Sequence, residues 1–182
     1  SLYEDWPISY EDLKPYYELN EKEMSVSGLI GDPMYPDIEE LLPPVPIGKT
    51  GELIAKAFNK KGWHWWPSPS AISTKDRKGR NACINLGPCN TGCPQGAKSS
   101  ADITYIAKAK DMGLDMYTEC FVDSIIVKNN LVRGVVYFDN KGVRQELLAD
   151  KVILAASAIG TPRLLLNSED SSNNKGVANS SG

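Results

Sequence analysis

Three of the four cysteines lie close together in this sequence, at Cys83, Cys89 and Cys93, whereas Cys120 is remote. Cysteines at such short intervals ligate metal ions as thiolates, pair as disulfides or remain free. A structural zinc site needs four ligands and usually pairs cysteines two to four residues apart. His64 is a candidate fourth ligand, but it lies 19 positions upstream of Cys83 among tryptophans, where a packing or surface role is favoured. The spacing also matches neither usual four-cysteine iron–sulfur pattern, so the residues leave these alternatives open.

A second candidate site follows the apolar run from Lys151 to Ala156, which is typical of a buried parallel strand. The run leads through small residues into a helix pattern that Thr161 and Pro162 open. Small residues after a strand let a backbone approach a nucleotide closely, and a helix start offers free N–H groups. Close packing of the helix on its sheet explains the same residues. The sequence lacks a G-x-G-x-x-G motif, and therefore a complete pyrophosphate loop.

The composition limits the class of protein. The chain has 182 residues, which allows one domain with an appendage, and 41% hydrophobic residues, which excludes a disordered chain. The net charge of -3 argues against a nucleic-acid partner, because binding phosphates needs a basic surface. No apolar run approaches the roughly 20 residues of a transmembrane segment. The chain begins with Ser1 rather than Met and shows no targeting signal, so we expect an excised piece of unknown localisation, cytoplasmic or bacterial periplasmic.

Residues 1–98 are predicted to form a helical and irregular segment that contains the Cys-rich loop. Ser9 and Asp12 have the spacing of a capping box at a helix start. Pro15 is expected to begin a second helix, which Gly28 ends.

A proline-rich connection over 29–49 is predicted to be irregular, and the next helix is expected to begin at Thr50 and end at Gly62. Three tryptophans follow, at Trp63, Trp65 and Trp66. Their rings suit a substrate entrance, although core packing explains them as well.

Residues 99–167 are predicted to alternate helix and strand, and residues 168–182 to form a ragged loop or tail. A hairpin turn is expected at Asn129-Asn130, and a second turn over 139–142. The predicted elements are a helix from Ser99 or Ser100 to Gly113, strands at 114–120, 124–128, 132–138, 143–149 and 151–156, and a helix through 161–166.

Several of these motifs together resemble the glucose–methanol–choline (GMC) oxidoreductase family. The run Val152–Leu166 resembles the second half of its flavin domain, and Trp6–Tyr17 resembles the segment between the two halves. Gly92–Ser99 is similar to a motif of the branch that acts on gluconate, sugars and long-chain alcohols. The resemblance implies an α/β fold: an incomplete, Rossmann-like FAD-binding domain portion with a β-hairpin excursion and an inserted helical and loop segment.

The implied function is that of a fragment of an FAD-dependent oxidoreductase acting on CH–OH groups of alcohols or sugars. In the family a general base takes the hydroxyl proton while hydride moves to the flavin. The family's glycine-rich N-terminal unit and its late catalytic histidine are both expected outside this chain. We therefore assign no catalytic residue here and expect the isolated fragment to be inactive.

The resemblance also implies cofactor contacts. In relatives, the residue that follows the strand predicted at 114–120 recognises adenine through its backbone N–H and C=O, and Val122 matches it. Ala156 and Ser157 would lie against the adenosine of FAD, and Ser157 stands where relatives usually carry glycine. An ordinary buried strand residue is the alternative for Val122.

The spacing of Cys83, Cys89 and Cys93 is similar to a loop that holds a three-iron cluster in relatives with sugar dehydrogenase activity. Such an iron-sulfur cluster would pass electrons to an external acceptor, which implies an electron-acceptor protein or a small subunit as partner. Free or disulfide-bonded cysteines and a zinc site remain the alternatives. The competing function is a freestanding metal-binding or interaction module centred on these three residues.

Overall fold

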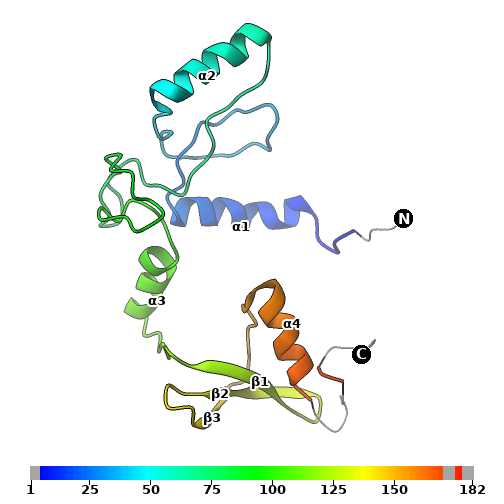
Figure 1. Ribbon diagram of the computed structural model, residues 1–182. Helices are drawn as coiled ribbons and strands as arrows, with labels where there is room; N and C mark the ends of the chain where they lie inside the picture. Colours follow the sequence, from blue (N-terminus) through cyan, green and yellow to red (C-terminus); the bar gives the residue numbers. More distant parts are fainter. Residues whose placement is uncertain (1–4, 170–174, 178–182) are drawn as a thin grey trace. The chain divides into compact units, whose positions relative to one another are not determined.

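The computed structural model describes residues 5–169 and 175–177, and it divides into two compact units, Ser1–Leu114 and Asp115–Gly182 (Figure 1). The helices are α1 (Tyr10–Glu23), α2 (Gly48–Lys61), the π-helical turn η1 (Asp102–Ile106), α3 (Ala107–Asp111) and α4 (Ser157–Asn167), and the strands are β1 (Phe121–Lys128), β2 (Leu131–Phe138) and β3 (Arg144–Leu148). Within the described residues, no helix is both long and apolar enough to cross a membrane. The mixed α/β class expected from the sequence is confirmed.

The capping box predicted at the start of α1 is confirmed. The Ser9 N–H donates to Asp12 Oδ2 at 2.8 Å, and the Asp12 N–H donates to Ser9 Oγ at 3.3 Å. The Ser9 hydroxyl also donates to Asp12 Oδ2 at 2.7 Å, and this bond, followed by that from the Ser9 N–H, holds the pKa of Asp12 below its ordinary value. Two orphan donors of the first turn are thereby satisfied.

The predicted break at Pro15 is wrong, because Pro15 lies inside one continuous helix. A proline in a helix leaves the carbonyl four residues earlier without its donor, and here that residue, Glu11, is exposed and open to water. The helix also ends before the predicted Gly28. Met24 is its C-cap, and Ser25 takes a left-handed φ of 52° that directs the chain away from the helix axis.

Main-chain pairs between distant segments hold the irregular part of the first unit together. Ser27 and Ser70 exchange two N–H to O=C hydrogen bonds of 2.8 Å, and Leu42 donates to the Val26 carbonyl at 2.9 Å. The buried side chains here are small: Ser25, Ser27, Ser73 and Ala97 are each at most 1% exposed. The unit is therefore stabilised by backbone hydrogen bonds around small residues more than by a large apolar core.

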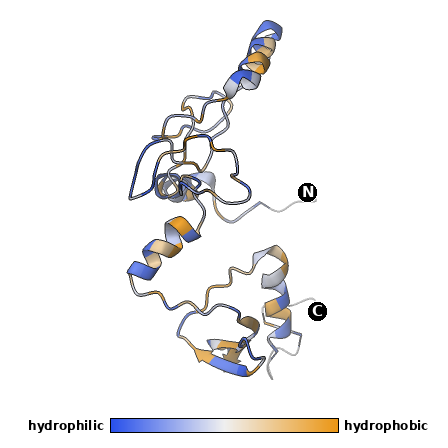
Figure 2. Ribbon diagram, turned by 60° about the vertical axis from the view of Figure 1, so that its left-hand side comes forward, coloured by the Kyte–Doolittle hydropathy of each residue, from blue (hydrophilic) through white to orange (hydrophobic). Residues whose placement is uncertain are grey.

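Helix α2 ends as predicted at Gly62, which adopts the left-handed conformation that glycine takes without a steric penalty (φ 68°). Its start is not the predicted Thr50. The N-cap is Ile47, which makes no side-chain hydrogen bond. Figure 2 shows hydrophilic and hydrophobic residues mixed along this helix, and Leu53 and Ile54 are both exposed.

The helix predicted from Ser99 or Ser100 begins later, with the π-helical turn η1, and has no side-chain cap. The Ser100 hydroxyl instead donates to the Asp102 carboxylate. Both η1 and α3 fall in the first unit. The structural division lies after Leu114, whereas the sequence analysis places the boundary after residue 98, and the domain to which this helix belongs in a longer protein stays a prediction.

The second unit contains an antiparallel sheet of order β1-β2-β3. Asn129 and Asn130 join β1 to β2 with left-handed φ values of 53° and 58°, as a type I′ hairpin turn requires, so this prediction is confirmed. The second predicted turn is confirmed as well. The backbone N–H groups of Val143 and Lys141 donate to Asp139 Oδ1 and lower the pKa of this carboxyl group.

Two predicted strands are absent from the described residues. Residues 114–120 and 151–155 pair with no described strand, and Glu119 takes a left-handed φ of 56° that interrupts the first of these runs. Ile153 in the second run is 91% exposed. A strand forms only where a neighbour accepts and donates its backbone hydrogen bonds, and an apolar sequence alone does not supply one. As a result Val122 is the second residue of β1, not the residue after a preceding strand.

Helix α4 packs on β1 and begins at Ser157, four residues before the predicted Thr161. Ile125 of β1 and Leu164 of α4 are buried, as is Val136 of the neighbouring strand β2. Ser168, at the start of the predicted tail, is 2% exposed. Of the rest of 168–182, residues 170–174 and 178–182 lie outside the described residues.

Ser168 joins the end of α4 to the sheet, and this contact gives a stability prediction. The Ile125 N–H donates to Ser168 Oγ at 2.7 Å, and the Ser168 hydroxyl donates to the Leu164 carbonyl. Ser168→Ala should lower the free energy of unfolding by about 1–3 kcal/mol, because it leaves the buried Ile125 N–H without an acceptor. Urea unfolding measures this, with Ser124→Ala as the control. Equal losses in the two variants would contradict the assignment.

Candidate functional site

Val122 lies on a free edge of the sheet in the described structure, because β1 pairs there with β2 alone. Its carbonyl accepts a hydrogen bond of 3.0 Å from Arg163 Nη2 on α4. An antiparallel ladder turns the N–H and C=O of alternate residues away from the partner strand, and this side-chain contact indicates that Val122 is one of them. The strand therefore presents an outward-facing donor and acceptor of the same residue.

A register irregularity follows immediately after Val122. The pairing with β2 skips Asp123, so one extra residue is accommodated in β1. Such a bulge shifts the alternation by one residue. The next outward-facing group is then that of Ile125 rather than Ser124, in agreement with the hydrogen bond from Ile125 to Ser168.

Arg163 is a residue that the sequence analysis missed. Besides its bond to Val122, its guanidinium lies over the Phe121 ring, 4.8 Å from the centroid. The residue is six positions after Ser157 on α4, and it brings this helix to the candidate edge of β1. The apolar helix pattern gave no signal for this role, since the partner is a main-chain carbonyl remote in sequence.

Ala156 and Ser157 lie where α4 begins, and both are exposed. Ser157 takes a left-handed φ of 67°, which costs a residue with a Cβ of the order of 1 kcal/mol. This conformation explains why a glycine suits the position. The Ala156 N–H donates to Thr161 Oγ1 at 3.2 Å, so Thr161 supports the helix start instead of beginning the helix. Small, exposed residues at this point fit the approach of a nucleotide.

The three clustered cysteines line one small cavity of about 20 Å³ in the first unit. This volume holds about one water molecule. Among the residues that the structure describes, no group of three histidine, cysteine or acidic side chains is arranged to hold a metal ion. His64 lies elsewhere: its Nε2 pairs with Asp32 Oδ1 at 2.9 Å, which removes it as a fourth ligand in this structure.

The loop around Cys93 directs main-chain donors at sulfur. The backbone N–H of Lys98, followed by those of Gln95, Ala97 and Gly96, lowers the pKa of the Cys93 thiol. The turn that supplies these groups is fixed by Arg80, whose guanidinium donates to the Gly96 carbonyl at 3.1 Å and the Ala97 carbonyl at 2.9 Å. The arrangement stabilises a thiolate at Cys93.

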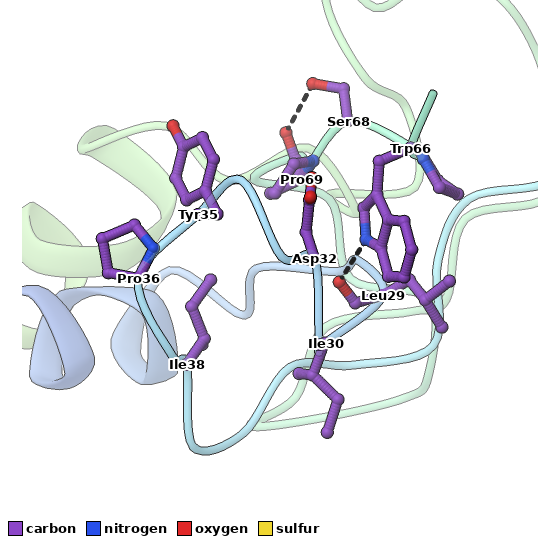
Figure 3. Close-up of a pocket in the computed structure, with 11 residues that line it drawn as sticks. Leu29, Ile30, Asp32, Tyr35, Pro36, Ile38, Trp66, Ser68 and Pro69 are labelled. Atoms are coloured by element: carbon purple, nitrogen blue, oxygen red, sulfur yellow. Dashed lines mark hydrogen bonds between the residues drawn. The ribbon is translucent and has the colours of Figure 1, made fainter. Parts of the chain in front are cut away.

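A larger cavity of about 240 Å³ is lined by residues of the proline-rich segment and of 66–69 in the same unit (Figure 3). Its walls are apolar and aromatic, with Asp32 as the acidic group. Trp66 forms one wall and donates from its indole nitrogen to the Leu29 carbonyl at 2.8 Å. Trp63 and Trp65 instead contact Phe58 and Asn59 of α2. Of the three tryptophans, Trp66 thus lines a cavity of the kind that small amphipathic molecules fill.

Comparison with known proteins defines the class. The sequence model of the GMC oxidoreductases matches residues 47–178, which include the cysteine loop, β1 and α4. The chain belongs to this family, whose members are flavin-dependent oxidoreductases. The resemblance noted from the sequence is confirmed, and a freestanding metal-binding module is not favoured.

The chain is also similar to several named relatives. It is 45% identical over 98% of its length to the 2-methyl-1,2-propanediol dehydrogenase of Mycolicibacterium austroafricanum, and 29% identical over 97% to the fructose dehydrogenase large subunit of Gluconobacter japonicus. It is 25% identical over 90% of its length to the gluconate 2-dehydrogenase flavoprotein of Pantoea cypripedii. The chain spans 33%, 33% and 30% of these relatives.

The strained start of α4 gives a second prediction. Ser157→Gly should raise the free energy of unfolding by about 0.5–1 kcal/mol, because glycine adopts a positive φ without the steric cost. Ser157→Ala is the control, since it removes the hydroxyl but keeps the Cβ, and it should give no such gain. Thermal unfolding of the three proteins measures the difference. A gain in the alanine variant equal to that in the glycine variant would show that strain is not the cause.

Proposed function

We propose that this chain holds the adenosine end of FAD in an oxidoreductase that acts on CH–OH groups of an alcohol or sugar. The observation that carries the proposal is the outward-facing main chain of Val122 on an edge strand. The family match supports it, because this edge lies within the matched residues. The names of the three relatives, dehydrogenases of a diol, fructose and gluconate, support a hydroxyl-bearing substrate.

The residues fit the cofactor by their chemistry. The adenine edge carries an acceptor nitrogen beside an amino donor, and the N–H and C=O of Val122 are the complementary pair. Ala156 and Ser157 offer little side-chain bulk and would lie against the sugar of the adenosine. When bound, FAD supplies the hydride acceptor for oxidation of the alcohol, while these residues bind and orient it. We expect the 182-residue chain by itself not to retain FAD through gel filtration or turn over an alcohol, because it supplies only the adenosine contacts, which bind a nucleotide in rapid exchange.

Two substitutions test the cofactor site in the flavin enzyme that carries this chain. Ser157→Trp should abolish FAD retention, because an indole fills the space that adenosine would occupy. Val122→Ala should leave FAD retention nearly unchanged, because the contact is made by main-chain atoms. The measurement is the flavin-to-protein ratio after gel filtration, read from absorbance. Loss of FAD in the Val122 variant together with retention in the Ser157 variant would refute the geometry.

We also propose that Cys83, Cys89 and Cys93 ligate a three-iron cluster. Three cysteine sulfurs match, in type and number, the protein ligands that three irons of such a cluster need. The N–H groups around Cys93 favour its thiolate form. The cavity of about 20 Å³ is too small for a cluster, so the loop must open to accommodate one. A cluster there would supply an electron exit to an acceptor protein or small subunit.

The cluster proposal predicts about three irons per chain and a low-temperature electron paramagnetic resonance signal in anaerobically prepared enzyme. Each Cys→Ser change at the three positions should lower electron transfer to external acceptors and spare reduction of the flavin by substrate. Cys120→Ser is the control, because this thiol lies outside the loop and donates to the Thr118 carbonyl. Less than about one iron per chain, or a disulfide within the triplet, would overturn the proposal and leave the cysteines a structural role.

A further inference from the structure

Arg163 makes two contacts that an adenine ring could also make. Its guanidinium Nη2 donates a hydrogen bond to the Val122 carbonyl at 3.0 Å, and its Cζ lies over the Phe121 ring, 4.8 Å from the centroid. An adenine ring makes the same two kinds of contact, since it donates from its amino group and stacks on aromatic rings. The Val122 carbonyl and the Phe121 ring, which contact the guanidinium here, are therefore also suited to an adenine ring.

We infer that Arg163 is an internal competitor of the adenine ring: its guanidinium occupies the Val122 carbonyl and the Phe121 face until a nucleotide displaces it. This inference rests on the proposed function, because it assumes that Val122 is the adenine contact. It adds that cofactor loading requires a movement of the Arg163 side chain.

The surroundings of Arg163 permit such a movement. Its side chain is only partly buried, and among the described contacts no carboxylate pairs with its guanidinium. The backbone of α4 need not shift when the side chain leaves, because Ser168 and Leu164 hold the helix to the sheet independently. The competing contact is a charge-assisted hydrogen bond to a neutral acceptor. Such a bond is strong enough to hold the guanidinium in place without a nucleotide, and weak enough for a nucleotide to displace it.

The test uses the ¹⁵N-labelled 182-residue chain, titrated with AMP and with IMP as separate probes. In IMP an oxo group replaces the amino group of AMP and the neighbouring ring nitrogen carries a hydrogen, so its edge does not match the N–H and C=O of Val122. AMP should shift the Val122 amide resonance in a saturable way and should also shift the Arg163 Nε–H resonance as the guanidinium leaves Phe121. IMP should bind more weakly.

Arg163→Gln should raise the affinity for AMP about tenfold, the effect expected from removal of one competing charge-assisted hydrogen bond. The affinity for IMP should change much less. Arg163→Lys keeps a hydrogen-bond donor but loses the planar guanidinium. Its affinity for AMP should lie between those of the wild-type chain and Arg163→Gln. Arg144→Gln is the matched control, because Arg144 lies in the same unit and pairs with Glu146 instead. The dispersion of the amide spectrum establishes that each variant is folded.

The outcomes separate this inference from the proposed function. AMP binding that is unchanged or weakened in Arg163→Gln, with AMP still preferred over IMP, would overturn the competitor role and leave the adenine site in place. Absence of any saturable shift at Val122 in the wild-type chain and in every folded variant would overturn the adenine site and the inference together.

Discussion

The free edge of β1 is the constraint on which the second unit depends. Backbone N–H and C=O groups must find partners, and an edge strand has a row of them with no strand beside it. Here α4 supplies these partners with side chains. Arg163 binds the Val122 carbonyl, and Ser168 accepts from the Ile125 N–H. The bulge at Asp123 fixes which residues face outward, and so it fixes both where the helix docks and which main-chain groups of β1 lie at the open edge.

The first unit satisfies its backbone in a different way. Its long irregular segments pair with each other at isolated positions, around buried serines that leave room for the main chains to approach. Arg80 extends this arrangement to the cysteine loop by binding two of its carbonyls. The turn at Cys93 then directs N–H groups toward sulfur. A loop built in this way positions the Cys93 sulfur through its backbone, with little need for a large apolar core beneath it.

Both candidate sites are built from main-chain groups, which face outward at the edge of β1 and point at a sulfur atom at Cys93. At Val122 they form a donor and acceptor pair, and at Cys93 a group of donors. In the roles that we propose, side chains act mainly by their size, as at Ser157, or by competition, as at Arg163. This use of main-chain groups explains why the sites carry few of the polar side chains that usually reveal a binding site in a sequence.

Features that depend only on neighbouring residues could be predicted from the amino-acid sequence. The capping box at Ser9 and Asp12, the turn at Asn129-Asn130 and the glycine cap at Gly62 each follow from local chemistry, and all three were predicted. The ordered motifs also identified the family, because they reflect constraints of the whole fold.

The tertiary structure alone decided which extended segments became strands and which groups met across the chain. The runs 114–120 and 151–156 have strand-like sequences but pair with no described neighbour, whereas β1 forms because β2 folds back onto it. Arg163 reaches Val122 only because α4 packs on β1. Each of these outcomes depends on a partner remote in sequence, since backbone hydrogen bonds between segments cannot be inferred from the residues of one segment.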